Sequence, residues 1–199
     1  MVDLSIMADL SQYVDLKEYN FLFAAACIIF NPLFWNVVAR WEYRTHTLTR
    51  LFRSPYIGCY SLGAVIISLA LYRSHCFTEA MAFQPQLDFL KGQEFYYIGV
   101  ALVAVGGVLV ISSFLALGFV GTYLGDYFGI LMDEKVTCFP FIVMENPMYW
   151  GSTANYLGLA LMNSSPAGLV LTAVVAISYK VAILFEGPFT EKIYRMKEK

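Results

Sequence analysis

The sequence predicts an all-α integral membrane protein: a helical bundle with three transmembrane spans plus a proline-broken N-terminal membrane segment. Hydrophobic residues make up 59% of the 199 residues and charged residues only 14%, which is unusual for a soluble domain. Acidic and basic residues are absent from four long windows, namely 19–39, 54–72, 95–125 and 146–179. About 20 apolar residues suffice to cross the hydrocarbon core of a bilayer. A soluble fold would have too little polar surface to cover these windows, and the length suits a single membrane-embedded domain over residues 1–199.

The first window, residues 19–39, contains Asn31-Pro32 near its middle. Proline lacks a backbone donor and crowds the preceding turn of a helix, and the freed carbonyl needs a partner inside lipid. The window therefore predicts either a kinked span or a re-entrant hairpin. Arginines follow it at positions 40, 44, 50 and 53.

The second window, residues 54–72, predicts a span that Arg73 closes, followed by a polar loop over 73–94. The third predicts a helix from near Phe95 to about Leu117. The next glycines include three at i, i+4 spacing, a pattern that would place a smooth stripe on one helix face for close helix packing. They are Gly121, Gly125 and Gly129.

The fourth window is too long for one simple span and contains two prolines. It predicts a partly irregular segment near 146–163 and a span near 166–185, which Gly187-Pro188 ends. The 40–53 region and the C-terminal tail are both basic, so the positive-inside rule favours one common side for them. Three spans between them would place them on opposite sides, and charge alone leaves the orientation open.

Few side chains could carry chemistry at membrane depth, where ionisable groups are often functional. The candidate bases are Glu145, Asp126 and His75; each could equally be an ordinary group at the membrane interface. Tyr149-Trp150 favours either an interfacial aromatic belt or a wall for a cationic ligand, since aromatic faces attract onium groups.

Other patterns exclude whole classes of function. The four cysteines show no C-x-x-C spacing and neither histidine has a cluster of metal ligands beside it, so no metal site is expected. The net charge of −2 argues against a nucleic-acid partner. The small residues Ala104-Val105-Gly106-Gly107 by themselves favour helix packing.

Three stretches together resemble the phosphatidylethanolamine N-methyltransferases, a membrane-embedded family of phospholipid methyltransferases. They are FNPLFWNVVARWE at 30–42, LGFVGTYLGDYFG at 117–129 and NPMYWGSTANYLG at 146–158. The resemblance extends from about residue 20 to 196. Fungal phospholipid methyltransferases and, more distantly, isoprenylcysteine carboxyl methyltransferases belong to the wider class.

The resemblance implies S-adenosylmethionine as methyl donor and phosphatidylethanolamine as acceptor, with its mono- and dimethyl forms. Three successive methylations would give phosphatidylcholine in the endoplasmic reticulum membrane, with mitochondria-associated membranes as a further location. The donor is cytosolic, which implies that the C-terminal tail and the 73–94 loop face the cytosol. The oligomeric state is left open.

The family binds the donor with a G-x-G in the third span and a Glu-Glu pair after the last. These motifs correspond here to Ala104-Val105-Gly106 and to Glu186-Gly187, each half kept. If the head group becomes a fixed cation as methyl groups accumulate, Tyr149 and Trp150 are our hypothesis for the walls around it, because aromatic faces attract such cations.

The alternatives to this reading are a methyltransferase of another lipid or of isoprenylcysteine, a non-catalytic membrane scaffold, and a small lipid transporter. The more distant isoprenylcysteine enzymes have Arg-His-Pro before the tyrosine, whereas this chain has Glu145-Asn146-Pro147, which favours a phospholipid.

Overall fold

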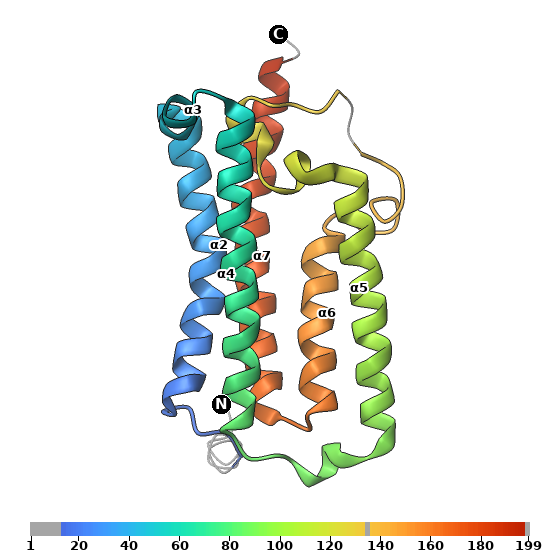
Figure 1. The fold of residues 1–199 in the computed structure, drawn as a ribbon. Coiled ribbons are helices and arrows are strands. Elements are labelled where there is room, and N and C mark those ends of the chain that lie inside the picture. Colours follow the sequence, from blue (N-terminus) through green and yellow to red (C-terminus); the bar gives the residue numbers. More distant parts are fainter. Residues whose placement is uncertain (1–12, 134–135, 198–199) are drawn as a thin grey trace, which may run out of the picture.

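A computed structural model describes residues 13–133 and 136–197, and it confirms the all-α bundle. Figure 1 shows the long helices side by side in alternating directions. Within the described ranges every regular element is helical, and in chain order these are α2 (Tyr19–Thr45), α3 (Thr47–Phe52), α4 (Pro55–Ala82), η1 (Asp88–Lys91), α5 (Gln93–Thr122), η2 (Gly125–Phe128), α6 (Pro147–Met162) and α7 (Pro166–Lys197).

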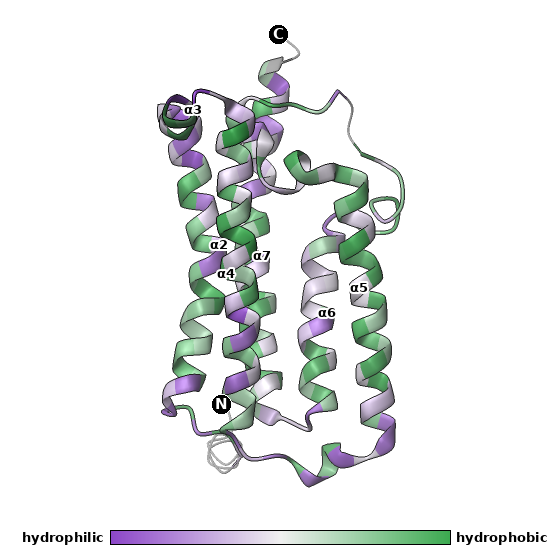
Figure 2. Ribbon diagram, viewed as in Figure 1, coloured by the Kyte–Doolittle hydropathy of each residue, from purple (hydrophilic) through white to green (hydrophobic). Residues whose placement is uncertain are grey.

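Four of the helices are long and apolar enough to cross a membrane, so the chain is a multi-pass membrane protein. These spans are Tyr19–Thr45, Pro55–Ala82, Gln93–Phe128 and Pro166–Met196. Figure 2 shows hydrophobic residues along the helices and hydrophilic ones gathered around the connections at the two ends of the bundle.

The first segment is one continuous helix. Of the two predicted alternatives, a kinked span and a re-entrant hairpin, the hairpin is therefore wrong. Pro32 lies inside α2. The Asn36 side chain donates a 3.1 Å hydrogen bond to the Pro32 carbonyl, and the Asn31 side chain donates to the Leu69 carbonyl of α4 at 3.2 Å. Polar side chains thus find carbonyl partners around the proline, as a helix in lipid requires.

The predicted loop over 73–94 is wrong in its first half, because α4 continues to Ala82. Arg73 does not close the span but lies within it and is buried. His75 is likewise a helical residue, exposed on the outside of α4.

The segment predicted as irregular near 146–163 is a regular helix, α6, of 16 residues. It runs antiparallel to α5. Figure 1 shows α4 running along the bundle in one direction and α5 and α7 in the other, with α5 followed by the shorter α6, which returns the chain to the end from which α7 begins. An even number of passes therefore separates the arginines near α3 from the C-terminal end of α7, and both lie at the same end. We call this the basic end.

The 73–94 region reaches the opposite end of the bundle (Figure 1). The expectation that it shares a side with the C-terminal tail is therefore wrong. The prediction counted three spans between the 40–53 region and the C-terminal tail, whereas the chain passes along the bundle four times there, in α4, α5, α6 and α7.

The predicted glycine stripe is also wrong, because the segment is not one helix. The backbone of Gly118 has φ 66° and ψ −179° and interrupts α5, a conformation essentially confined to glycine. The helix prediction to about Leu117 is confirmed up to this break. Gly125 then begins the 3₁₀ helix η2, and Gly129, with φ 77°, ends it.

The last helix does not stop at Gly187-Pro188, where an end was predicted. Pro188 lies inside α7, which continues to Lys197. At this level the Arg40 guanidinium of α2 donates to the Phe185 carbonyl at 2.6 Å and lies over the Phe189 ring. The Arg40 guanidinium, from a distant part of the sequence, therefore donates a hydrogen bond to α7 close to Pro188.

Two pairs of glycines bring α5 and α6 into backbone contact. A Cβ added to Gly99 would lie 2.7 Å from the Gly158 carbonyl oxygen, and one added to Gly151 would lie 2.8 Å from that of Gly106. Small residues permit such close approach of membrane helices. The α5–α6 pair is thus fixed along its length, with the other long helices across from it (Figure 1).

Candidate functional site

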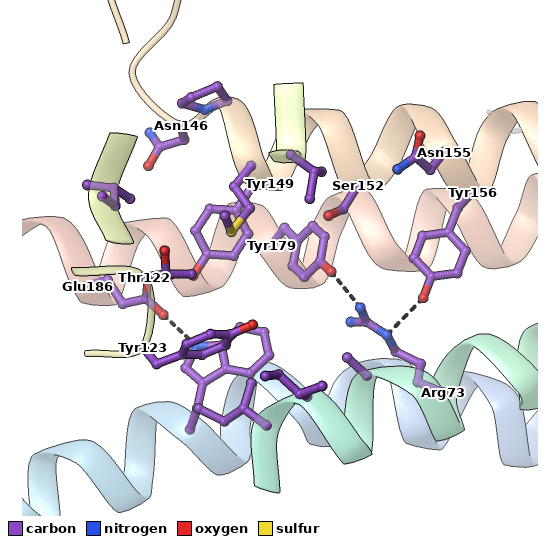
Figure 3. Close-up of a pocket in the computed structure, with 18 of the residues that line it drawn as sticks. Arg73, Thr122, Tyr123, Asn146, Tyr149, Ser152, Asn155, Tyr156, Tyr179 and Glu186 are labelled. Carbon is purple, nitrogen blue, oxygen red and sulfur yellow. Dashed lines mark hydrogen bonds between the residues drawn. The ribbon is translucent and has the colours of Figure 1, made fainter. Parts of the chain in front are cut away.

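A cavity of about 510 Å³ lies between the α5–α6 pair and helices α2, α4 and α7. Figure 3 shows part of its wall, with Arg73 and Glu186 on opposite sides of the tyrosines. The polar and aromatic residues that line the cavity are Trp35, Arg73, Ser74, Thr122, Tyr123, Glu145, Asn146, Tyr149, Ser152, Asn155, Tyr156, Tyr179 and Glu186.

Glu186 of α7 is the most strongly hydrogen-bonded carboxylate of the cavity wall. Its Oε1 accepts from Trp35 Nε1 and from Asn36 Nδ2, both at 2.7 Å, and its Oε2 accepts from the Tyr149 hydroxyl at 2.5 Å. Charge-assisted hydrogen bonds of this kind are short and strong. The carboxylate is therefore held in one orientation by side chains of α2 and α6.

Three aromatic rings lie beside this carboxylate and form what we call the aromatic cluster: Trp35, Tyr149 and Tyr179. The ring centroids of Tyr149 and Tyr179 are 4.9 Å apart, and each lies 6.5 Å from that of Trp35. Aromatic faces attract ammonium and sulfonium cations. A fixed carboxylate next to three rings suits a cationic ligand.

Arg73 of α4 lies at the inner end of the cavity. Its Nε donates to the Tyr156 hydroxyl at 3.1 Å and its Nη2 to the Tyr179 hydroxyl at 2.8 Å, as Figure 3 shows. Its side chain is 6% exposed, and its Nη1 is buried with no hydrogen-bond partner. Tyr179 thus joins the arginine to the aromatic cluster.

The side of the cavity between α4 and α5 is aliphatic. It is lined by Ile66, Ile67, Ala70 and Leu71 of α4 and by Val110 and Leu117 of α5. Leu71 is 69% exposed, so this wall continues onto the lipid-facing surface. Acyl chains could be accommodated there while polar groups reach the hydrogen-bonding side chains.

Of the three predicted bases, the structure brings only Glu145 to the cavity. It is exposed, in the connection that precedes α6. Asp126 instead accepts a 2.9 Å hydrogen bond from the Thr190 hydroxyl of α7, which ties η2 to that helix. His75 points away from the bundle and does not line the cavity.

The residues expected to bind the donor do not come together in one place. Glu186 lines the cavity, whereas Ala104 and Val105 are exposed on α5. Gly106 is buried against α6, where a Cβ would meet the Gly151 carbonyl and the Asn155 side chain. Asn155, not Gly106, faces the cavity at that level.

Gly187, which stands where the family has a second glutamate, is exposed. No heavy atom lies within 4 Å of a Cβ added there. A longer side chain at this position would therefore meet no steric obstacle in the chain.

The two aromatic residues predicted as cage walls, Tyr149 and Trp150, do not lie on the same side of α6. Tyr149 points into the cavity and bonds Glu186, whereas Trp150 is 41% exposed and is not among the residues that line it. Tyr179 takes the place expected for Trp150.

Sequence reasoning missed four residues of this site: Trp35, Arg73, Tyr156 and Tyr179. One signal was present. Arg73 is a cation that directly follows a charge-free window, and had the helix been extended past it, it would have appeared as an ionisable group at membrane depth. The three aromatic residues carry no comparable local signal. Across the described ranges no group of three or more histidine, cysteine or acidic residues is placed to hold a metal ion.

Comparisons with known proteins agree along nearly the whole chain. A family model described as phospholipid methyltransferase matches residues 95–197. Phosphatidylethanolamine N-methyltransferase of Rattus norvegicus is 60% identical over 191 residues, and that of Homo sapiens 57%, each match covering 96% of both chains. Phosphatidyl-N-methylethanolamine N-methyltransferase of Saccharomyces cerevisiae is 50% identical over 194 residues, which is 98% of this chain and 94% of the yeast protein. No solved structure matches.

Proposed function

The chain belongs to the phospholipid methyltransferase family, and we propose that it methylates the amine of phosphatidylethanolamine three times in succession, with S-adenosylmethionine as donor. The resemblance expected from the sequence motifs is confirmed by these matches. The product of three transfers is phosphatidylcholine.

The observation that carries the proposal is the fixed carboxylate of Glu186 beside the aromatic cluster. Positive charge is present on both sides of the reaction: the donor is a sulfonium, and the lipid nitrogen gains a positive charge with each transfer until it is a quaternary ammonium. Rings and a carboxylate stabilise such charges in a low-dielectric site. A cavity of about 510 Å³ with polar walls and an aliphatic side offers room for polar and apolar groups together.

The donor supplies an electrophilic methyl group: the amine lone pair forms the new N–C bond as the C–S bond breaks, and that electron pair stays on sulfur. The protein must therefore align two groups, and one proton must leave the head-group nitrogen for each transfer, because the nitrogen is an ammonium at neutral pH and attacks only as the free amine. Trp35, Asn36 and Tyr149 keep Glu186 in place for binding. Glu145 is the candidate proton acceptor that reaches the cavity.

The basic end of the bundle is proposed to face the cytosol, since the positive-inside rule now applies without conflict. Arg50, Arg53, Lys192 and Arg195 belong to this end. The mouth of the cavity, at Glu145 and Asn146, lies beside it, so a cytosolic donor could enter there. We further propose the endoplasmic reticulum, with mitochondria-associated membranes, as the location.

The function is tested with purified protein, methyl-labelled donor and vesicles that contain one acceptor at a time. Phosphatidylethanolamine, its monomethyl form and its dimethyl form should all become labelled. Label only on the methylated acceptors would restrict the chain to the later transfers, the reaction named for the yeast relative. An isoprenylcysteine acceptor should stay unlabelled.

The absence of label from every lipid, with a folded protein, would favour a scaffold or a transporter. Glu186→Ala is the matched inactive variant, because it removes the carboxylate on which the proposal depends.

A further inference from the structure

Arg73 has an unmet binding capacity at the inner end of the cavity. It is 6% exposed, and its two hydrogen-bond partners, Tyr156 and Tyr179, are neutral phenols. Among the described residues no carboxylate forms an ion pair with it. Burying a guanidinium without a counter-charge is strongly unfavourable. The free Nη1 therefore points to an anion that arrives with a ligand.

The depth of Arg73 decides which anion this is. Arg73 lies 18 residues after Pro55, with which α4 begins at the basic end, and this is about 27 Å along a helix axis. A hydrocarbon core is about 30 Å thick, and residues 54–72, which precede Arg73, carry no charge. The phosphate of a phospholipid whose head group lies at the basic end would therefore have to sink through most of the core to reach this arginine.

The donor has no such restriction. It is a soluble molecule that carries a carboxylate three carbons away from its sulfonium, and it can enter the cavity end-on from the basic end. Arg73 and the aromatic cluster share Tyr179, so an anion at Arg73 and a cation at the cluster would be neighbours. This matches the spacing of opposite charges within the donor.

Resting on the proposed function, we infer that Arg73 is the residue that binds the α-carboxylate of S-adenosylmethionine. Two guanidinium nitrogens hold the tyrosine hydroxyls, and Nη1 is left to donate to the carboxylate; a lysine ammonium would not present these donors in the same planar arrangement. Ser74 and Asn155 line the same inner end and add polar groups. Arg73 would set how far the donor enters the cavity, and hence the level at which its methyl group meets the lipid amine.

The test compares S-adenosylmethionine with decarboxylated S-adenosylmethionine, which keeps the sulfonium and lacks the anion. Binding is measured at equilibrium by calorimetry, with purified protein and no acceptor lipid. The wild type should bind the complete donor roughly ten- to a hundred-fold more tightly, the range expected for a hydrogen bond to a charged group. In Arg73→Gln the affinity for the complete donor should fall until the ratio of the two affinities is about one.

Arg73→Lys keeps the charge without the fork and should give an intermediate ratio. Lys180→Gln is the matched control, because Lys180 is a cation on the exposed side of α7, next to Tyr179 in sequence; its ratio should equal that of the wild type. Thermal unfolding identifies any variant that does not fold. In that case the ratio of the wild-type affinities for the complete and the decarboxylated donor still tests the inference.

A wild-type ratio near one, or an unchanged ratio in folded Arg73→Gln, would overturn the inference. So would a raised KM for the lipid with donor binding intact, which would assign Arg73 to the lipid phosphate instead. Lipid methylation by the wild type is scored separately, so failure of this inference leaves the proposed function standing.

Discussion

The Tyr149 hydroxyl donates a 2.5 Å hydrogen bond to Glu186 Oε2 and so connects the start of α6 with α7. The two residues are 37 positions apart and come from different sequence motifs, NPMYWG and the half-kept acidic pair. The other oxygen of the same carboxylate binds Trp35 and Asn36 of α2. Glu186 is therefore the point at which three helices meet the cavity.

Glu186→Gln should lower kcat/KM for the donor by about ten- to a hundred-fold, the effect of losing hydrogen bonds to a charged group. The amide keeps one oxygen but turns an NH₂ group toward donors that need an acceptor. Steady-state kinetics with methyl-labelled donor measure the change.

The control is Glu191→Gln, five residues further along α7, where the carboxylate is 70% exposed and forms an ion pair with Arg195. Exposed pairs contribute little, so this variant should behave as the wild type. Equal losses in both variants would mean that Glu186 acts through helix stability and not through binding.

Tyr149→Leu should impair all three methylations, whereas Trp150→Leu should not. Leucine at 149 removes both a ring of the aromatic cluster and the donor to Glu186. The loss should be about ten-fold or more, since it combines a cation–π contact with a hydrogen bond. Tyr149→Phe separates the two contributions. Rates on each acceptor measure the effect, and a larger loss in Trp150→Leu would show that the cage lies on the outer face of α6.

Gly106→Ala should destabilise the bundle by about 1–3 kcal/mol, the usual cost of overpacking. The added methyl group would meet the Gly151 carbonyl and the Asn155 side chain. Gly107→Ala is its neighbour and control: nothing lies within 4 Å of a Cβ there. Thermal unfolding in detergent should separate the two variants. If Gly106→Ala were as stable as the wild type and yet lost donor affinity, direct donor contact would be the better explanation.

Glu42→Ala should loosen the arginine-bearing turn at the basic end. The Glu42 carboxylate is fully buried and accepts from the backbone N–H groups of Leu48 and Thr49, at 2.6 and 3.0 Å, and from the Thr49 hydroxyl at 2.6 Å. Leaving these donors without a partner costs about 1–3 kcal/mol. Hydrogen exchange over 46–53 should quicken.

Glu79→Ala serves as the control for this turn, because that carboxylate is exposed on α4. Its exchange pattern should match the wild type. Unchanged protection in Glu42→Ala would mean that packing of α3 on α4, and not the carboxylate, orders the turn.

The membrane spans were predictable because a charge-free window is a local property of the sequence. The errors arose where tertiary partners override local signals. Pro32 lies inside the continuous helix α2, where Asn36 donates to the Pro32 carbonyl and Asn31 donates to the Leu69 carbonyl of α4. The segment at 146–163 was predicted to be partly irregular because its window is long and contains two prolines, but Pro147 and Pro166 are the first residues of the regular helices α6 and α7.

The site was predictable in part, through motifs that contain Tyr149 and Glu186. Arg73 and its partners were not, because Tyr156 and Tyr179 are 83 and 106 positions away from it and meet it only when the helices pack. Gly106 was interpreted in two ways: the spacing alone favoured helix packing, and the family resemblance implied donor binding. The structure places Gly106 against α6, and its role in donor binding stays a prediction.

The shortness of α6 has a consequence for the bilayer itself. Its 16 residues rise only about 24 Å, less than the roughly 30 Å of a typical hydrocarbon core. Such hydrophobic mismatch is relieved by local thinning of the membrane. Lipids beside α6 would then be drawn inward, toward the level of Glu145 and Asn146. Local thinning of the bilayer beside α6 would thereby shorten the path of a lipid head group into the cavity.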